Sequence, residues 1–476
     1  FNSLHVYMVT LIPQWACALW EVSCWTIRPL AFGSRRNVVV SQEKAFVGEI
    51  NKYVPNSFYR RLLLYGIAWF NKDLDESIPQ EYKEEIYGVS QNFSDEFDFI
   101  GPKFNRIINY HAAHDIGHMV QNMNLVACSA IAEWNYEDEN PAFFAARNFD
   151  FYFGDDFAKN KIVLFCNPKN GYDYVSVSWG GLCGVVSGMN EMGLSVTLNS
   201  LPSEIPSSAS TPVSIIAREV VQYASTIEEA VKIISKRNVF VSESFTIASA
   251  IDKKAVVVEK TPNSTDVFYP EGNKLIVTNH FQGPKMCESD LNKEHILESE
   301  SMPRFLRLEE LSANNNSEPR ASLFLSYLRN QKGVGNTDLG LGNPMAINQL
   351  LAHHAVVFDI NHKIAWISNA PWQENILNAY ALENIKNMAN LGPRINPAID
   401  SLELGVDPFY NSAEYNNFLV YKNLKQDFLK EQSENPDSIF TKEFFLELIG
   451  NNPNYYEGYK LAGDHLKKNG FTAEAA

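Results

Sequence analysis

The chain has 476 residues, of which 45% are hydrophobic and 12% aromatic, so it can bury a large core and exceeds a typical single domain. Its formal net charge of -16 argues against nucleic acid as a partner. The six cysteines lie far apart, which indicates neither a disulfide framework nor a cysteine zinc site and leaves the redox compartment open. They occupy positions 17, 24, 128, 166, 183 and 287.

The N-terminal segment from Val6 to Leu30 is apolar and rich in tryptophan, with interruptions at Pro13 and Glu21. It lacks a basic leading region, so it fits a signal peptide poorly, and it is too interrupted to predict a membrane-spanning helix. Residues 6–30 are a candidate for contact with a membrane surface or for a hydrophobic groove wall. We favour packing against the core. For localisation, the segment slightly favours an extracytoplasmic or membrane-associated protein.

Three histidines, His111, His114 and His118, recur at helical spacing in the stretch 110–119, on one face as a zinc site would need. A zinc-dependent hydrolase is therefore the alternative mechanism, and the later pair His353-His354 could add a fourth ligand. The stretch lacks the glutamate of the usual zinc-helix motif, however, and its histidines could equally be core or capping groups. The main reading therefore predicts no metal and no cofactor.

A thiol, a guanidinium and a carboxylate come together around Cys128. The residues on both sides of Cys128 have the pattern of a strand, and Ala142 to Ala146 begins a second strand that leads to Arg147 and Asp150. Pairing of these strands would bring both charged side chains within reach of the thiol. A neighbouring guanidinium favours the thiolate. The alternative is a structural Arg-Asp pair beside a core cysteine.

Two asparagines end later strands. The stretch 178–199 has the pattern of two strands joined by the turn Gly188-Met-Asn-Glu-Met-Gly193, and it ends at Asn199. Asn279 follows the apolar run that begins at Leu275. Two asparagines so placed could donate the hydrogen bonds that stabilise a developing oxyanion. Each alone is more often a turn residue that ends a strand.

Strands and helices alternate without the regular order of a parallel sheet, which predicts an α+β fold. The predicted strands are 161–165, 174–178, 245–250, 255–260, 355–358 and 364–368. The predicted helices are 212–223, 227–234 and 302–311, and Ser225-Thr-Ile-Glu-Glu supplies a cap and an acidic first turn for the second.

These motifs, in this order, resemble the N-terminal nucleophile hydrolases, and within them the acyl-coenzyme A:6-aminopenicillanic acid acyltransferase family. Similarity to bile salt hydrolases, penicillin V acylases and acid ceramidase is more distant. The resemblance spans roughly residues 80 to 370. It rests on Glu84-Glu-Ile-Tyr-Gly-Val-Ser90, Cys128-Ser-Ala, Arg147-Asn-Phe-Asp150, Gly188-Met-Asn-Glu-Met-Gly-Leu194 with Leu198-Asn199, Thr278-Asn-His-Phe281 and Pro303-Arg-Phe-Leu-Arg307.

The resemblance implies a precursor cut by its own nucleophile between Ala127 and Cys128. The freed α-amine of Cys128 would then be the base for its own thiol, since an α-amine has a pKa of about 7.7 to 8.0. By similarity, each site residue has a role. Asp150 would orient the amine, Arg147 would polarise the surroundings of the nucleophile, Asn199 and Asn279 would form the oxyanion hole, and Arg304 would be a further active-site arginine, with Arg307 one turn away as the alternative.

The fold that the resemblance implies is a four-layer αββα sandwich of two antiparallel sheets. Residues 1–127 would be the prosegment and small subunit, 128–370 the catalytic core and 371–476 a mainly helical extension. The extension contains apolar helical patterns at 444–449 and 455–466. One stretch of it faintly resembles half of a tetratricopeptide repeat, but a single copy does not establish an array.

The resulting prediction is a self-processing cysteine amidohydrolase or acyltransferase that forms a thioacyl intermediate at Cys128. Its partner would be a small acyl amide or acyl donor. The sequence does not distinguish hydrolysis from transfer, and it does not indicate the oligomeric state. The aromatic run Phe149, Phe151, Tyr152 and Phe153 could line an acyl pocket or belong to the sheet core. A second alternative is a catalytically idle binding module with the same fold. An uncut chain would lack the amine base.

Overall fold

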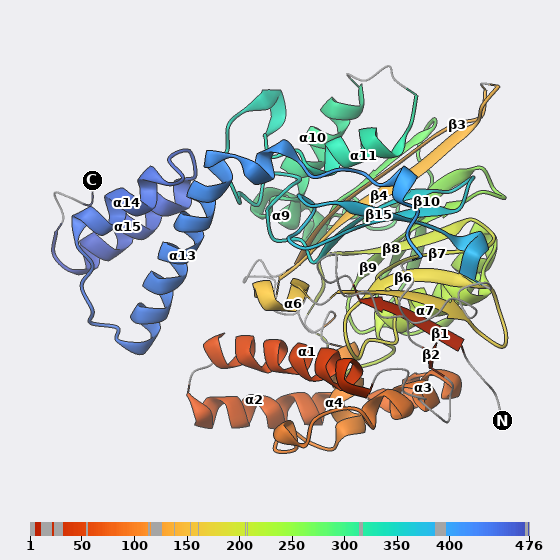
Figure 1. The fold of residues 1–476 in the computed structure, drawn as a ribbon, viewed down its shortest axis with the longest axis horizontal. Coiled ribbons are helices and arrows are strands. Elements are labelled where there is room, and N and C mark those ends of the chain that lie inside the picture. The colour runs from red at the N-terminus through yellow and green to blue at the C-terminus, as the bar shows by residue number, and fades with distance from the viewer. Residues whose placement is uncertain are drawn as a thin grey trace.

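A computed structural model describes the greater part of the chain (Figure 1). The described residues are 5–10, 21–22, 32–53, 56–112, 115, 126–137, 139–152, 154–159, 161–204, 206, 208–313, 318–385, 397–471 and 475.

Two antiparallel sheets form the centre of the molecule. The nine-stranded sheet has the order β11 (Thr265–Phe268), β10 (Lys254–Lys260), β9 (Glu243–Ser249), β8 (Leu194–Ser200), β7 (Ser187–Asn190), β6 (Tyr174–Ser178), β5 (Ile162–Asn167), β1 (His5–Thr10) and β2 (Glu21–Val22). The six-stranded sheet has the order β12 (Lys274–Val277), β3 (Val126–Asn135), β4 (Ala142–Phe151), β13 (His354–Asp359), β14 (Ile364–Ser368) and β15 (Leu377–Ala381).

Helices surround the sheets, and short 3₁₀ turns join several of them. The helices are α1 (Phe32–Tyr53), α2 (Ser57–Phe70), α3 (Gln80–Ser90), α4 (Lys103–His111), α6 (Asp155–Lys159), α7 (Val213–Tyr223), α8 (Ile227–Lys236), α9 (Asp290–Glu298), α10 (Ser301–Ala313), α11 (Ala321–Leu328), α13 (Ala413–Glu434), α14 (Lys442–Gly450) and α15 (Tyr456–Lys468). The 3₁₀ turns are Leu74–Ser77, Asp95–Phe97, Val334–Asn336, Leu382–Asn384, Asp400–Leu402 and Pro408–Asn411.

The layers follow from the alternation of side chains along each strand. One set of apolar side chains, including Val177 and Val356, is buried between the two sheets. The outer face of the nine-stranded sheet packs against α7 and α8, and that of the six-stranded sheet against α10 and α11. The predicted α+β fold and its αββα layer order are therefore confirmed.

Local sequence explains why α8 begins where it does. Thr226 is its N-cap, with a hydroxyl that accepts a hydrogen bond from the Glu229 amide at 3.3 Å. The Glu229 carboxylate in turn accepts the Ser225 amide at 2.8 Å. The cap predicted at residues 225–229 is confirmed.

The predicted strand hairpin before Asn199 is confirmed only in part. Only the second half of the predicted turn 188–193 is a turn, because β7 continues through Asn190. There Gly193 has a φ of 76°, and Asn190 Oδ1 accepts the amides of Met192 and Leu194 at 3.1 and 3.0 Å. The first strand, β7, is only four residues long, however, because the glycine-containing stretch 179–186 is irregular rather than extended. The other six predicted strands and the three helices are present within a few residues of their expected bounds.

The two terminal regions are helical and pack differently. Helices α3 and α4 bury Tyr82, Ile86 and Ile107 in the core that also contains α7 and α8. Helices α13 to α15 have an apolar core of their own, which includes Phe428 and Leu448, and they extend away from the sheets in Figure 1. The domain boundaries at residues 127 and 370 stay predictions.

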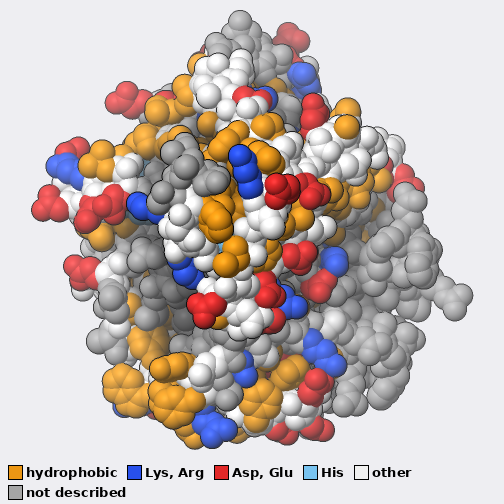
Figure 2. All heavy atoms as spheres, turned by 90° about the vertical axis from the view of Figure 1, so that its left-hand side faces the viewer, with side chains coloured by type: hydrophobic (Ala, Val, Ile, Leu, Met, Phe, Trp, Pro, Cys, Tyr) orange, Lys and Arg blue, Asp and Glu red, His pale blue; other side chains and the backbone are white. Residues whose placement is uncertain are grey.

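The apolar N-terminal segment is described in part. Its residues 6–10 lie in β1, which pairs with β5, while residues 11–20 and 23–30 are outside the described part of the chain. Within that described part, no helix is long and apolar enough to cross a membrane. Figure 2 shows hydrophobic side chains gathered at the lower edge, where the N-terminal helices lie in Figure 1. Contact of residues 6–30 with a membrane surface stays a prediction.

Candidate active site

The register of β3 against β4 sets the geometry around Cys128. Cys128 lies opposite Phe149, and Ala130 lies opposite Arg147. Because residues two apart on a strand share a face, Cys128, Phe149 and Arg147 are on one face of the hairpin. Asp150 lies opposite Ala127, on the other face. The predicted hairpin therefore places a thiol and a guanidinium together and a carboxylate beside the preceding peptide bond.

The Cys128 thiol is in direct contact with Arg147. Arg147 Nη2 donates to Cys128 Sγ at 3.2 Å, and both side chains have no exposed surface. Burial raises the pKa of Cys128 to about 11, although Arg147 lowers it. The guanidinium favours the thiolate, as expected, but the cost of burying a charge exceeds the attraction of this one cation. The thiol is protonated at neutral pH.

The backbone of Cys128 is held from both sides. Its N–H donates to Asn279 Oδ1 at 3.0 Å, and its carbonyl oxygen accepts a hydrogen bond from Arg304 Nη1. Arg304 also donates to Asn279 Oδ1 at 2.8 Å and to Ser129 Oγ at 3.0 Å. These contacts fix the position of the peptide unit on each side of the nucleophile's Cα atom.

The two asparagines expected to form an oxyanion hole direct their N–H groups elsewhere. Asn199 Nδ2 donates to the carbonyl oxygens of Val277 and Thr278 at 3.3 and 3.1 Å. Asn279 Nδ2 donates to the Ser200 carbonyl and hydroxyl oxygens at 3.0 and 2.8 Å. Both residues lie near the nucleophile as expected, but in this arrangement each side-chain NH2 group is already engaged.

The structure also distinguishes the two arginines of α10. Arg304 contacts Cys128, whereas Arg307 donates to Asn330, Glu310 and Asn336 at 2.6 to 3.0 Å. The two arginines are three residues apart on the helix, so their side chains point in neighbouring but not identical directions. Arg304 is therefore the arginine at the site.

Asp150 is a fully buried carboxyl with one hydrogen-bond donor. Gln349 Nε2 donates to its Oδ2 at 3.3 Å, and its Oδ1 accepts no hydrogen bond from the described residues. Burial raises the pKa of Asp150 to about 7, although Arg304 and Arg147 lower it. The carboxyl therefore titrates near neutrality while no amine faces it.

A pH-dependent stability follows from this pKa. Since the folded chain binds the Asp150 proton more tightly than the unfolded chain does, this stabilisation is lost as pH rises from about 4 to about 7. Asparagine carries no such proton. In a chain that also carries Cys128→Ala, the effect of Asp150→Asn on folding stability should therefore become more favourable by up to about 4 kcal/mol over that range. Urea unfolding of both chains at several pH values measures this. A pH-independent difference would show that Asp150 keeps its ordinary pKa.

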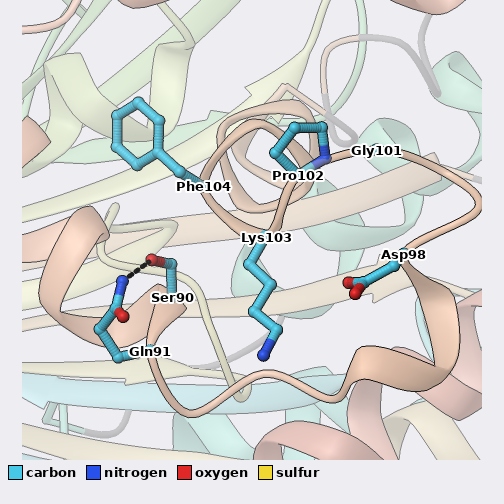
Figure 3. A pocket seen from close by; sticks show the side chains of 7 residues that line it. All are labelled: Ser90, Gln91, Asp98, Gly101, Pro102, Lys103 and Phe104. Atoms are coloured by element: carbon cyan, nitrogen blue, oxygen red, sulfur yellow. Dashed lines mark hydrogen bonds between the residues drawn. The ribbon is translucent and has the colours of Figure 1, made fainter.

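Cys128 is closed to solvent. Strand β3 runs unbroken through Val126, Ala127 and Cys128, and Cys128 has no exposed surface. A pocket of about 490 Å³ lies elsewhere, between the end of α3 and the start of α4 (Figure 3). It is lined by Ser90, Gln91, Asp98, Gly101, Pro102, Lys103 and Phe104. None of the predicted site residues lines that pocket.

The aromatic residues after the hairpin are packed rather than open. Phe149 and Phe151 are fully buried and stack on each other and on Trp179, with ring centroids 5.4 to 6.4 Å apart. Tyr152 is half-buried and its hydroxyl lies 3.3 Å from Asp155 Oδ1. Phe153 is outside the described residues. Of the two readings, the structure shows the sheet core.

The three-histidine alternative can be examined only at His111, because His114 and His118 lie outside the described residues. Helix α4 ends at His111. Its Nδ1 lies 2.8 Å from the Ile107 carbonyl oxygen, and its Nε2 accepts the Cys183 amide at 2.8 Å. Both ring nitrogens thus have backbone partners. Among the described residues, no cluster of His, Cys, Asp or Glu is placed to hold a metal ion.

Sequence reasoning missed several residues that shape the site. Val186 O and Ser187 Oγ both accept from Arg147 Nη1 at 2.9 Å. Glu243 is fully buried and raises the pKa of Cys128. Ser187 and Glu243 lie on other strands, and Val186 directly precedes one of them. No local motif marks these residues, since their importance depends on which strands become neighbours.

Comparison with known proteins gives a family and several distant likenesses. Residues 134–367 match the sequence model of the acyl-coenzyme A:6-aminopenicillanic acid acyl-transferase family. An uncharacterized protein of Archaeoglobus fulgidus is 25% identical over 218 residues, which are 42% of this chain and 36% of that protein. The match thus spans about a third of the relative's length.

Two solved structures share part of the arrangement. The N-acylethanolamine-hydrolyzing acid amidase ortholog of Caenorhabditis elegans has a TM-score of 0.35 and 19% identity, over 49% of this chain and 93% of that one. A variant of the conjugated bile acid hydrolase from Clostridium perfringens has a TM-score of 0.35 and 13% identity, over 57% of this chain and 95% of that one.

Proposed function

Because residues 134–367 match the sequence model of the acyl-coenzyme A:6-aminopenicillanic acid acyl-transferase family, we propose that the chain breaks the C–N bond of an N-acyl amide with the Cys128 thiol. The observation that carries the proposal is the arrangement around one residue. Arg147 donates to the Cys128 sulfur, while Asn279 and Arg304 hold its N–H and C=O groups. A core cysteine needs none of these contacts, since it packs as a small apolar side chain.

The first reaction in the proposal is self-cleavage. The Cys128 sulfur attacks the carbonyl carbon of Ala127, a C–S bond forms, the Ala127–Cys128 C–N bond breaks, and the thiol proton passes to the leaving nitrogen. Water then hydrolyses the thioester, which leaves a carboxylate on Ala127 and restores the thiol. Burial of Cys128 supports this order of events, because no external substrate can reach the sulfur before the chain opens.

Cleavage would also create the base that the second reaction needs. The new α-amine would replace the Cys128 N–H, whose nitrogen lies 3.0 Å from Asn279 Oδ1. Asp150 is close to this position, because it lies opposite the preceding residue, Ala127. The Asp150 Oδ1 atom accepts no hydrogen bond from the described residues, so it is available to an ammonium. With a pKa of about 7.7 to 8.0, the amine can take the thiol proton near neutrality.

The amide reaction then proceeds through a thioacyl intermediate. The thiolate attacks the substrate carbonyl, the protonated amine gives its proton to the leaving nitrogen, and the acyl group remains on sulfur. Water or an amine takes the acyl group, which gives hydrolysis or transfer. For Asn199 and Asn279 to stabilise the oxyanion, their NH2 groups would have to leave Val277, Thr278 and Ser200 when substrate binds.

A series of N-acyl anilides with a chromogenic amine tests this function. Quenching in acid during turnover should give the fragment that begins at Cys128 a mass increase equal to the acyl group. Peptide mapping should place the group on Cys128. Release of the amine with no acyl group on Cys128 under any quench condition would contradict the thioacyl mechanism, and no release from any acyl chain length would contradict the amide substrate.

A further inference from the structure

A chain of buried polar side chains leads from Arg147 away from Cys128. Arg147 Nη1 donates to Ser187 Oγ at 2.9 Å, and the same hydroxyl oxygen lies 2.9 Å from His354 Nε2. His354 Nδ1 lies 2.8 Å from His353 Nδ1. All four side chains have no exposed surface. The chain therefore links the guanidinium on β4 to β7 and to the start of β13.

The chemistry of the first donor fixes the direction of the first hydrogen bond in this chain. A guanidinium can only donate, so Ser187 Oγ accepts from Arg147. Towards His354 Nε2 the hydroxyl is either the donor or a second-time acceptor, according to the tautomer of the histidine. In either tautomer, one of the two facing Nδ1 atoms of His353 and His354 donates to the other. Both imidazoles are neutral in this arrangement.

The orientation of Arg147 depends on this arrangement. Among the described residues, no carboxylate lies within salt-bridge distance of the guanidinium, which is placed by Val186 O, Ser187 Oγ and the Phe149 ring 4.2 Å below it. Of these, Ser187 is a rotatable hydroxyl. Its hydrogen bond with His354 holds the hydroxyl in the orientation that directs an oxygen lone pair at Arg147.

We propose that Ser187 and His354 are positioning residues that hold the Arg147 guanidinium against the Cys128 thiol. The catalytic consequence rests on the function proposed above. The effect on the ionisation of Cys128 does not rest on that function, because it concerns only how strongly the Arg147 guanidinium stabilises the thiolate. A hydroxyl that has lost its hydrogen bond with His354 can rotate, and the guanidinium then has one acceptor fewer to fix it.

Other charged groups face the thiol and the histidines. Those facing the thiol come from three elements: Arg147 and Asp150 on β4, Glu243 on β9 and Arg304 on α10. Those facing the histidines are Arg147 and Lys161. Burial and these cations hold the pKa values of both histidines well below the usual range. A change in the ionisation of Cys128 above neutral pH would therefore not come from the histidines.

The test follows the ultraviolet absorbance of the Cys128 thiolate as pH is raised. Each protein is measured against the same protein carrying Cys128→Ala, so that tyrosines and other thiols cancel. Ser187→Ala removes the hydroxyl, and Ser187→Thr keeps it. His354→Phe keeps a ring but loses the ring nitrogens, and His354→Gln keeps a hydrogen-bonding group near the Nε2 position. His354→Phe also keeps the test available if Ser187→Ala does not fold.

We expect Ser187→Ala and His354→Phe to raise the midpoint of thiolate formation by about one pH unit. Ser187→Thr and His354→Gln should return it to the wild-type value. In the amidase assay, the acidic limb of kcat/KM should move upward by the same amount with KM little changed. An unchanged midpoint in both Ser187→Ala and His354→Phe, whatever their stability, would overturn the inference. Failure of the proposed function would instead appear as no chain cleavage and no amide turnover, with the titration still deciding this inference.

Discussion

Cys128→Ala should leave the 476-residue chain whole and reduce amide turnover by at least about 10⁴-fold. The thiol is the nucleophile of both proposed reactions, and the alanine side chain cannot form either the peptide thioester or the thioacyl intermediate. Stability should change little for a small buried side chain. Denaturing mass spectrometry measures the first effect and release of a chromogenic amine the second.

The control for this variant is Cys166→Ala on β5. Cys166 is also a buried free thiol, but it forms a hydrogen bond with Tyr174, and the guanidinium that lowers its pKa is that of Arg218 instead of Arg147. We expect Cys166→Ala to be cleaved and active. Cleavage of the Cys128→Ala chain at the same bond would show that another group is the nucleophile, and equal loss in both variants would point to folding rather than chemistry.

Arg304→Ala should slow self-cleavage by about 100-fold or more. Arg304 donates to the Cys128 carbonyl oxygen and to Asn279 Oδ1, which itself holds the Cys128 N–H. Its removal frees the peptide unit that follows Cys128, and it leaves Asn279, which holds the N–H of the peptide unit to be cleaved, without a charged partner. Lysine should restore little, because one ammonium does not reproduce the two-armed contact of a guanidinium. The rate of fragment formation after synthesis in a cell-free system measures the effect.

Arg307→Ala is the matched control for that prediction. Both arginines are on α10 and are at most 3% exposed, but Arg307 reaches Glu310, Asn330 and Asn336 instead of the nucleophile. Its loss should lower stability without a comparable effect on cleavage. If Arg307→Ala slowed cleavage as much as Arg304→Ala, the effect would belong to the packing of α10.

Sequence patterns predicted the hairpin around Cys128 because its two strands are close together in the sequence and each has its own strand pattern. The alternation of residues before and after Cys128 indicated two strands, and their pairing brought Arg147 to the thiol. The same patterns predicted the α+β class. They could not predict that β12 would pair with β3 or β13 with β4, since periodicity identifies a strand but not its neighbour.

Other features of the site depend on three-dimensional placement that the sequence does not contain. The choice between Arg304 and Arg307 depends on the rotation of α10 about its axis. The NH2 groups of Asn199 and Asn279 point to backbone carbonyls, which depends on the conformation of the residues after β12. The high pKa of Cys128 reflects complete burial, which a list of neighbouring charges does not predict.

The central claim is that the chain cuts itself and that Cys128 becomes an N-terminal residue. Intact mass under denaturing conditions, with N-terminal sequencing of each species, tests it directly on the purified wild-type protein. The account predicts one fragment of residues 1–127 and one of residues 128–476 that begins Cys-Ser-Ala-Ile. A chain that stays whole while it hydrolyses amides would contradict the amine-base mechanism, and fragments with a different first residue would contradict the assignment of Cys128.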